Sequence, residues 1–288
     1  RTATTIIADT GNNRVIEVGV NKNTIWEYTD LKEPHVAKQL ANGNVLIAES
    51  GRHRVIEVDR DKDIVWQYGI ADSAGSGYNQ LFYPVRASRL SNGNTLIVDQ
   101  SNGRVIEVNR DKQIVWQMTG LYYPCDARKL DNGNVLIADT GNNRVIEVNV
   151  SNNRIVWEYA GLNCPHGAFR KKDGNILIAD TNNNRVIEID YNKMLICWEY
   201  TGLNQPTSAI ELSNGNILIS DSNNHWVMET NKDKVWLWQY GERGVTIGTY
   251  QHLNQPFSAE EVFAPTAGCI SGKVTRASDG GIVPKVII

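Results

Sequence analysis

The chain has 288 residues, of which 41% are hydrophobic and 21% are charged, and this composition is typical of a soluble globular protein with a sizeable core. The formal net charge is -3 and Lys and Arg form no cluster, so a nucleic-acid partner, which needs a basic stripe, is not expected. Every apolar run is much shorter than the ~18 residues of a membrane span, which predicts that the chain has no such span.

One sequence pattern recurs six times along the chain. Each copy joins two apolar segments through an acidic residue and a short turn, as in IIADTGNNRVIEV at residues 6–18. A tryptophan follows each acidic residue after 17 or 18 positions. Repetition with a period of about 40 residues is typical of propellers and other repeat architectures. The six acidic residues are Asp9, Glu49, Asp99, Asp139, Asp180 and Asp221.

Each copy contains four short segments rich in Val, Ile and Trp, separated by turn residues such as Asn-Gly. In residues 84–118 these segments are PVRASRL, NTLIVD, RVIEV and IVWQM. Apolar runs of this length with such punctuation predict strands and not helices. A small four-stranded sheet cannot bury both faces alone, and radial stacking of six sheets solves that problem. The sequence therefore predicts an all-β fold, a six-bladed β-propeller of four-stranded antiparallel blades.

The two ends of the repeat region predict that the ring is closed. The first copy begins at its second strand, residues 4–9, and lacks the Pro-x-x-Ala strand that opens the other copies. The missing strand follows the sixth tryptophan, at residues 256–262. We therefore expect residues 1–263 to form one propeller domain in which a C-terminal strand completes the first blade and removes exposed sheet edges.

The repeats resemble NHL repeats over about residues 2–262. The shared pattern is a proline, an alanine, a Gly-Asn turn, an Ala-Asp pair and an Asn-x-Arg, which in the fourth copy are Pro124, Ala127, Gly133, Asn134, Ala138, Asp139, Asn142 and Arg144. The W-[EQ]-Y strand ends and the NGNxLI turns are also similar to those of arylsulfotransferase-related propellers. These resemblances imply the fold, but such propellers serve as lyases, transferases, receptors and scaffolds, so the activity stays open.

Residues 264–288 depart from the repeat. The stretch ISGKVTRASDGGIVPKVII resembles the opening hairpin of carboxypeptidase-regulatory-like β-sandwich domains, but it has too few strands to form that sandwich. We expect a C-terminal β tail that is either part of a longer domain or a strand that adds to a neighbouring molecule. Because such modules accompany secreted and cell-surface proteins, the resemblance implies an extracellular or cell-surface location.

Charged and aromatic residues that recur in every blade are predicted to have structural roles. In five copies an arginine follows the acidic residue by five positions, as Arg144 follows Asp139. An enzyme needs a catalytic pair once, whereas a pair that braces a blade recurs in every blade. We therefore predict that the acidic residue and the arginine brace the blade. The recurring tryptophans are predicted to pack between blades. In the sixth copy Trp226 replaces the arginine, which predicts an aromatic binding position at the rim.

The two residues after each proline differ between copies and are predicted to lie at the axis. His35 and His166 belong to opposite blades and are predicted to face each other across one mouth, with Arg86, Cys125 and Asp126 between them. Such a cluster suits an anion or a divalent metal, with His35 and His166 as metal ligands and His35, Arg86 and His166 as catalytic residues. The alternative is a polar mouth filled by water. By resemblance, lyases with NHL propellers use axial metal-bound histidines, and arylsulfotransferases use axial histidines with arginine.

Two connections, residues 69–83 and 241–255, are about ten residues longer than the others. Long loops on a rigid scaffold often carry binding sites, so their aromatic residues Tyr78, Phe82, Tyr83 and Tyr250 are candidate binding residues. Insertions that merely pack over the channel are the alternative.

Cys125, Cys164, Cys197 and Cys269 have no metal-ligand spacing. Buried free thiols are the favoured prediction. Cys125 and Cys164 flank equivalent prolines, so theirs is the one disulfide pairing we consider as the alternative.

These features together predict an extracellular or cell-surface binding or scaffolding propeller that mediates assembly without catalysis. Its expected partner is a protein or a neighbouring subunit, engaged through the C-terminal tail, and no cofactor is expected beyond the candidate metal at the mouth. The alternative function is a lyase or sulfotransferase-type enzyme with its site at the axial mouth.

Overall fold

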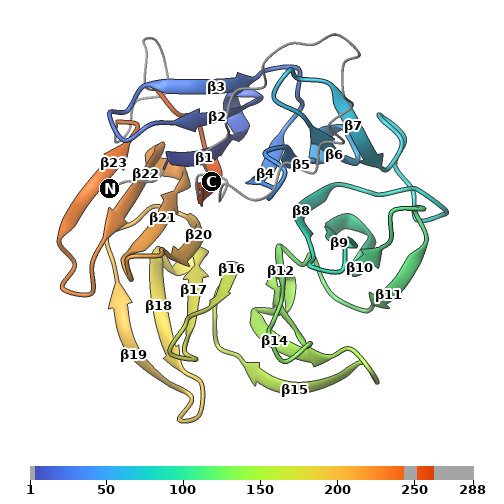
Figure 1. The fold of residues 1–288 in the computed structure, drawn as a ribbon. Coiled ribbons are helices and arrows are strands. Elements are labelled where there is room, and N and C mark those ends of the chain that lie inside the picture. Colours follow the sequence, from blue (N-terminus) through green and yellow to red (C-terminus); the bar gives the residue numbers. More distant parts are fainter. Residues whose placement is uncertain (1–3, 243–251, 263–288) are drawn as a thin grey trace, which may run out of the picture.

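The structure is a computed structural model that describes residues 4–242 and 252–262. Six four-stranded antiparallel sheets surround a central axis, as the repeats predict (Figure 1). From axis to rim, the first blade contains β24 (Pro256–Val262), β1 (Thr4–Asp9), β2 (Arg14–Val18) and β3 (Thr24–Tyr28). The second contains β4 (Pro34–Gln39), β5 (Val45–Glu49), β6 (Arg54–Val58) and β7 (Ile64–Tyr68). The third contains β8 (Pro84–Arg89), β9 (Thr95–Asp99), β10 (Arg104–Val108) and β11 (Ile114–Met118).

The remaining three blades follow the same order. The fourth contains β12 (Asp126–Lys129), β13 (Val135–Asp139), β14 (Arg144–Asn149) and β15 (Arg154–Tyr159). The fifth contains β16 (Pro165–Arg170), β17 (Ile176–Asp180), β18 (Arg185–Asp190) and β19 (Leu195–Tyr200). The sixth contains β20 (Pro206–Glu211), β21 (Ile217–Asp221), β22 (Trp226–Thr230) and β23 (Trp236–Tyr240).

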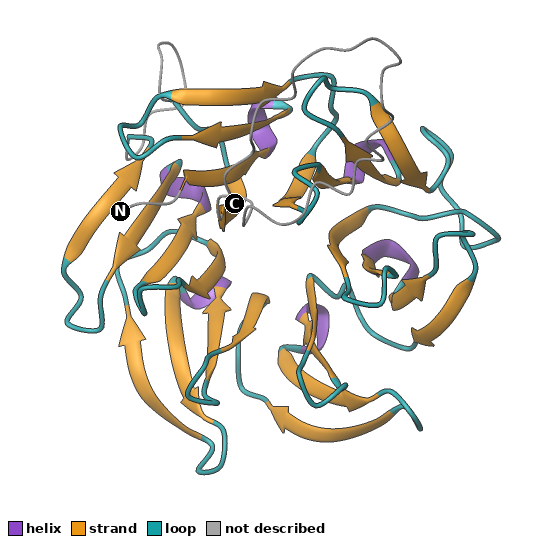
Figure 2. Ribbon diagram, in the orientation of Figure 1, coloured by secondary structure: helices purple, strands orange, loops and turns teal. Residues whose placement is uncertain are grey.

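A short 3₁₀ turn joins the second and third strands of every blade (Figure 2). The turns are η1 (Thr10–Asn12), η2 (Ser50–Arg52), η3 (Gln100–Asn102), η4 (Thr140–Asn142), η5 (Thr181–Asn183) and η6 (Ser222–Asn224). The residue after each turn adopts the left-handed conformation, and in three blades it is Asn, which tolerates that conformation better than most residues. Local turn chemistry thus sets each hairpin.

The predicted ring closure is confirmed. Strand β24 pairs antiparallel with β1, and the register places Val262 opposite Thr4 and Ala259 opposite Ile7. The first blade therefore joins the two ends of the repeat region, residues about 250 positions apart.

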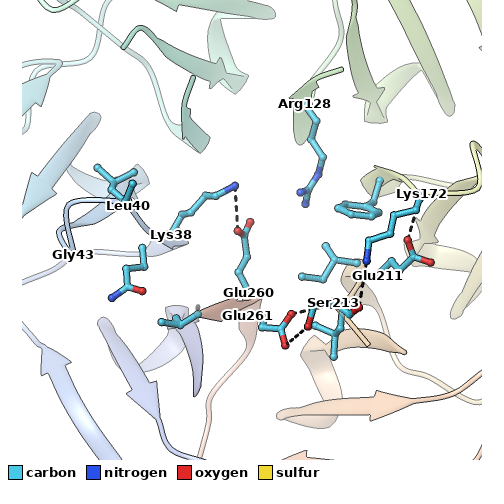
Figure 3. Close-up of a pocket in the computed structure, with 15 residues that line it drawn as sticks. Lys38, Leu40, Gly43, Arg128, Lys172, Glu211, Ser213, Glu260 and Glu261 are labelled. Carbon is cyan, nitrogen blue, oxygen red and sulfur yellow. Dashed lines mark hydrogen bonds and ion pairs between the residues drawn. The ribbon is translucent and has the colours of Figure 1, made fainter. Parts of the chain in front are cut away.

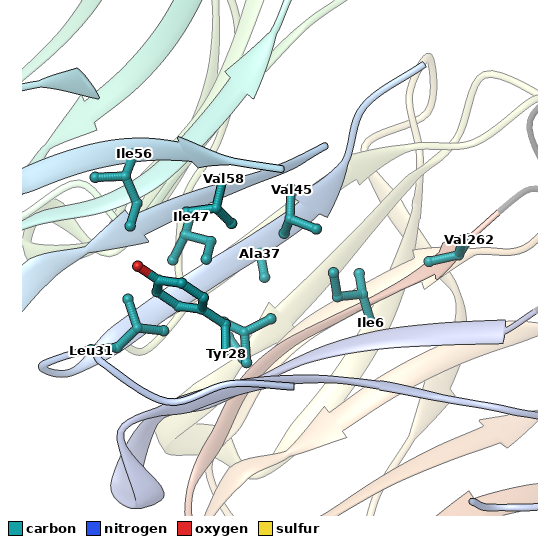
Figure 4. Packing of buried hydrophobic residues seen from close by; sticks show 11 residues of the cluster. Ile6, Tyr28, Leu31, Ala37, Val45, Ile47, Ile56, Val58 and Val262 are labelled. Carbon is teal, nitrogen blue, oxygen red and sulfur yellow. The ribbon is translucent and has the colours of Figure 1, made fainter. Parts of the chain in front are cut away.

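The hydrophobic core lies between neighbouring blades. Between the first two blades, Ile6, Ala37, Ile47 and Ile56 are fully buried and pack with Tyr28 in one cluster (Figure 4). Equivalent clusters fill the other interfaces. Each fully buried aliphatic side chain contributes about 1.5–3 kcal/mol relative to exposure, so the ring is held by inter-blade packing.

The predicted bracing role of the recurring acidic residues is confirmed. Asp139 is fully buried and accepts hydrogen bonds from Arg144 Nε at 2.9 Å, from Asn142 at 2.9 Å and from the backbone amide of Tyr122 at 2.8 Å. The same carboxylate-to-arginine contact spans 2.6–2.7 Å in four other blades. The carboxylate therefore ties the loop that enters a blade to that blade's own hairpin.

The predicted packing of tryptophans between blades is also confirmed. Trp26 Nε1 donates to the carbonyl of Arg60 at 3.4 Å, and Trp157 Nε1 donates to that of Tyr191 at 3.1 Å, in both cases on the next blade. Trp198 does the same with Lys232 at 2.8 Å.

The disulfide considered between Cys125 and Cys164 is not formed. Both thiols are free, as is that of Cys197, and of the three only Cys125 is buried. Cys125 Sγ accepts from Gln100 Nε2, and Cys164 Sγ lies beside His166. Tyr250, Cys269 and the tail at residues 264–288 lie outside the described residues. In the part of the chain that the structure describes, we find no helix long and apolar enough to cross a membrane.

Candidate functional site

The innermost strands bring residues from all six blades to the axis. In five blades the pairing register shifts after the strand's proline, as between Pro34 and Val36, and a bulge of this kind re-aims the side chain at the shift. The residue after the proline therefore lies at one end of the axis, here called the proline end. Beyond the bulge, alternate residues of each strand face the axis. The other end, beside the Asn-Gly turns, is called the turn end.

At the proline end His35 and His166 approach the same aromatic ring. The ring centroid of Phe257 lies 4.3 Å from that of His35 and 5.8 Å from that of His166. The ring of Tyr83 lies 5.4 Å from His35 on another side. The two histidines predicted to face each other are thus brought together, but with Phe257 against both, so this end is more aromatic than the sequence suggested.

Burial controls the protonation of His35. His35 is 8% exposed, and this burial lowers the pKa of its imidazole to about 4. The nearby His166 lowers it further, whereas the carbonyl of Glu33, 3.0 Å from Nδ1, acts in the opposite direction. At neutral pH the ring is neutral, and Nδ1 must carry the proton to donate to that carbonyl. Nε2 is therefore the unprotonated nitrogen, which can accept a hydrogen bond.

The two thiols near this end differ in surroundings. Cys125 is buried, and burial raises its pKa to about 11, so it is a poor nucleophile. Cys164 Sγ lies 3.7 Å from His166 Nε2. Among the described residues no three His, Cys, Asp or Glu side chains gather as a metal site would require. His35 and His166 alone would be fewer than the three or four protein ligands that zinc needs.

Midway along the axis lies a buried charge network that joins three blades. Arg86 Nε is 2.7 Å from Asp126 Oδ1, and Arg86 Nη2 is 3.0 Å from Glu260 Oε1. These three residues are 2–7% exposed. Asp126 also accepts from the backbone amide of Ala168 at 3.0 Å, which ties in the fifth blade. Arg86 and Asp126, both predicted at the axis, therefore form its structural centre.

Three further axial residues were missed by the sequence reasoning: Lys38, Arg128 and Glu260. Lys38 Nζ lies 3.5 Å from Glu260 Oε2, and Arg128 Nε lies 3.2 Å from Asp126 Oδ2. All three occupy the fourth position after a proline, whereas the prediction considered only the first two. The two-residue period of a strand was the available signal, since the second and fourth positions face the same side.

Two adjoining cavities open at the turn end. The larger, of about 520 Å³, is lined by Leu40, Phe169, Leu212 and Val262 together with charged side chains that include Lys38 and Arg128 (Figure 3). The smaller, of about 220 Å³, shares Lys38, Arg128 and Phe169 with the larger one. The volume of the larger cavity suits a small ligand.

The candidate binding residues of the long loop differ in accessibility. Tyr78 is 74% exposed and Phe82 is 42% exposed, so both present aromatic surface. Tyr83 is less exposed, and its hydroxyl donates to Glu33 at 2.7 Å. Tyr122 and Tyr123, exposed by 56% and 52%, were missed because they lie in an ordinary connection.

The prediction that Trp226 is an aromatic binding position at the rim is wrong, because its side chain is buried. The residue is 3% exposed, and Nε1 donates to Asp221 at 2.6 Å. The indole therefore occupies the place that arginine takes in the other blades, and its edge-to-face contact with Trp236, at 4.7 Å between ring centroids, fills the space beside it.

The chain is similar to known proteins in sequence and in structure. Residues 2–200 match the family model described as outer membrane protein assembly factor BamB. No curated protein matches the chain. A solved structure of a protein of unknown function from Bacteroides caccae is 18% identical with a TM-score of 0.69, over 83% of this chain and 93% of that one. Streptogramin B lyase is 13% identical with a TM-score of 0.62, over 85% and 80%. Virginiamycin B lyase from Staphylococcus aureus is 13% identical with a TM-score of 0.59, over 83% and 84%.

At these identities the structural likeness shows the propeller fold and does not extend to activity. The family match is a match of sequence, and it covers 199 of the 288 residues, which is more than half of the chain. The chain therefore belongs to the family described as outer membrane protein assembly factor BamB.

Proposed function

We propose that this propeller is a protein-binding scaffold that works outside the cytoplasm and catalyses no reaction. The observation that carries the proposal is the rim, defined as the outermost strands β3, β7, β11, β15, β19 and β23. Every one of these strands exposes apolar side chains by 38–63%, namely Ile25, Ile64, Val65, Ile114, Val115, Ile155, Val156, Leu195, Ile196, Trp236 and Leu237.

Edge strands with exposed apolar side chains favour binding to another chain. Among the described strands, each rim strand has a hydrogen-bonded neighbour on one side only, so its other edge can offer backbone donors and acceptors to a partner. A soluble protein normally protects such edges with charges or bulges, and an exposed apolar edge is a place where a partner strand can add. Six equivalent edges around one ring suit a scaffold that holds extended segments.

The family supports a protein partner and a location beyond the cytoplasm. Its description names a factor for the assembly of outer membrane proteins, that is, a protein that acts on other proteins at a membrane outside the cytoplasm. In this proposal residues 1–263 are the binding propeller, and residues 264–288 form a separate tail that engages a neighbouring subunit.

The test is to measure binding of an outer-membrane β-barrel protein, unfolded in urea and diluted into buffer, by fluorescence anisotropy. The variant Val65→Lys/Val115→Lys/Val156→Lys places charges on three rim edges and should weaken binding by at least about tenfold, since each edge charge opposes strand addition. The control is Ser91→Lys, because Ser91 is exposed and lies in the turn between β8 and β9, away from the rim strands. Absence of binding by the natural protein, or equal binding by the triple variant, would refute the proposal.

A second candidate function is catalysis at the proline end, favoured by two histidines that contact one aromatic ring, of which His35 is neutral with an unprotonated Nε2. The solved lyase structures of similar fold suggest streptogramin B as a first substrate to try. Turnover measured by chromatography that disappears in His35→Ala/His166→Ala would support this function. Absence of turnover, or turnover that survives in the double variant, would exclude it for this substrate.

A further inference from the structure

The turn end of the axis has a concentration of positive charge that the proposed function does not use. The smaller cavity is lined by the six cationic side chains Lys38, Arg86, Arg89, Arg128, Lys129 and Arg170, and no carboxylate contributes to its lining. We propose that the two adjoining cavities bind a small amphiphilic anion, with a carboxylate in the smaller cavity and an apolar body in the larger one.

The carboxylates near the axis are already engaged by other groups. Arg86 holds Asp126 and Glu260 at 2.7 Å and 3.0 Å. Outside the cavity, Glu57 binds Arg89 at 2.7 Å, and Glu147 binds Arg170 at 3.4 Å. Along the axis, among the residues that the structure describes, the three cations Lys38, Arg86 and Arg128 face two carboxylates, Asp126 and Glu260. The described cations there outnumber the described carboxylates by one.

Of the three axial cations, Arg128 is the one whose terminal nitrogens can bind the anionic group of a ligand. In the described residues its one ion pair runs through Nε, which is 3.2 Å from Asp126, and no hydrogen bond or ion pair there engages its two terminal nitrogens. Burial lowers the pKa of Arg128, and the neighbouring Arg86 lowers it further. The planar end of a guanidinium binds a carboxylate with two parallel hydrogen bonds, which fits the proposed head group.

The larger cavity provides the apolar half of the site. Figure 3 shows Arg128 and Lys38 entering this cavity from different sides, with Lys38 directed toward Glu260. The Phe169 ring lies under the Arg128 guanidinium, 5.1 Å from Cζ, and lines both cavities. Leu40, Leu212 and Val262 extend the apolar wall away from the cationic cavity.

The other carboxylates of the larger cavity do not compete for Arg128. Glu261 accepts from the Ser213 amide at 2.9 Å and from its hydroxyl at 3.1 Å. Glu211 accepts from the backbone amide of Lys172 at 2.9 Å. Both therefore have partners on the turns around the opening (Figure 3). A ligand that places its anionic group beside Arg128 and its chain along Phe169 and Leu212 satisfies both halves of the site.

The probe is octanoate, titrated below its micelle-forming concentration into the full chain by calorimetry. Octanamide, which has the same chain without charge, should bind at least about tenfold more weakly, as a charge-assisted hydrogen bond is worth more than a neutral one. Arg128→Gln should weaken octanoate binding by about tenfold or more. Lys38→Gln is the second variant and should act in the same direction. The Lys38 side chain is 39% exposed, against 15% for Arg128, so this change should disturb the fold less.

The matched control is Arg154→Gln, an exposed arginine far out on β15, which should bind octanoate as the natural protein does. Three outcomes would overturn the proposal: equal binding of octanoate and octanamide, full binding by both cavity variants, or no binding of octanoate at all. Inorganic phosphate that binds as tightly as octanoate would overturn the apolar half. Because the rim lies away from the axis, failure here leaves the scaffold proposal untouched, and the reverse is also true.

Discussion

Replacing Glu260 by glutamine should destabilise the propeller by on the order of 3 kcal/mol at neutral pH. Burial raises the pKa of Glu260, but Lys38, Arg86 and Arg128 outweigh burial and bring the pKa down from 4.5 to about 2. Each unit of pKa corresponds to about 1.4 kcal/mol of differential stability, which gives the stated magnitude. Because Glu260 lies on the closing strand β24, this charge also helps hold the first blade to the third.

The stability lost in Glu260→Gln should depend on pH, because the pKa of Glu260 is lower in the folded state than in the unfolded state. A carboxyl whose pKa is lower in the folded state stabilises the protein above its unfolded pKa, and this contribution disappears as the pH falls through the folded value. The stabilisation is therefore complete above about pH 5 and is roughly halved by about pH 3. Urea unfolding at several pH values between 7 and 3, followed by tryptophan fluorescence, measures the gap between the natural protein and Glu260→Gln.

The control is Glu261→Gln on the adjacent residue, which is partly exposed and for which a change below about 1 kcal/mol is expected. Two results would refute the reasoning: equal stability of Glu260→Gln and the natural protein at pH 7, or a gap that stays constant from pH 7 to pH 3.

Three further changes test other parts of the structure. The folded state disfavours protonation of His35, so the natural protein should lose stability on the order of 3 kcal/mol as the pH falls from about 6.5 toward 4. His35→Gln should lack this pH-dependent loss, which urea unfolding midpoints over that pH range measure. Asp139→Ala should cost about 3 kcal/mol in urea unfolding, since it removes a buried carboxylate with three donors, and an unchanged midpoint would contradict the bracing role. Trp226→Phe should cost about 2 kcal/mol, as it removes the donor to Asp221, and a thermal midpoint within error of the natural protein would exclude that contribution.

The fold could be predicted from the sequence because its causes are local and repeated. Short β-branched segments separated by Asn-Gly turns define the strands, and six copies of one pattern define the blades. Even the closure, which joins residues 4–9 to 256–262, was visible as one strand missing at the start and present at the end. The bracing by Asp139 and Arg144 could be inferred for the same reason, since both lie in one hairpin.

The axis depended on the tertiary structure. Arg86 and Glu260 are 174 positions apart, and only the ring brings the third blade's arginine to the first blade's glutamate. Sequence reasoning placed His35, Arg86, Asp126 and His166 at the axis but missed Lys38, Arg128 and Glu260. It also could not foresee that Phe257 contacts both histidines, because that contact depends on a bulge in each strand.

Local pattern by itself therefore determined the strands, the turns, the number of blades and the closure, since each follows from residues close in sequence or from comparison of one copy with the next. The balance of charge at the axis, the burial of Trp226 and the two cavities at the turn end were decided by the tertiary structure. These three features share one physical reason. Each depends on which side chains from different blades meet around the axis or between blades, and no single repeat contains that information.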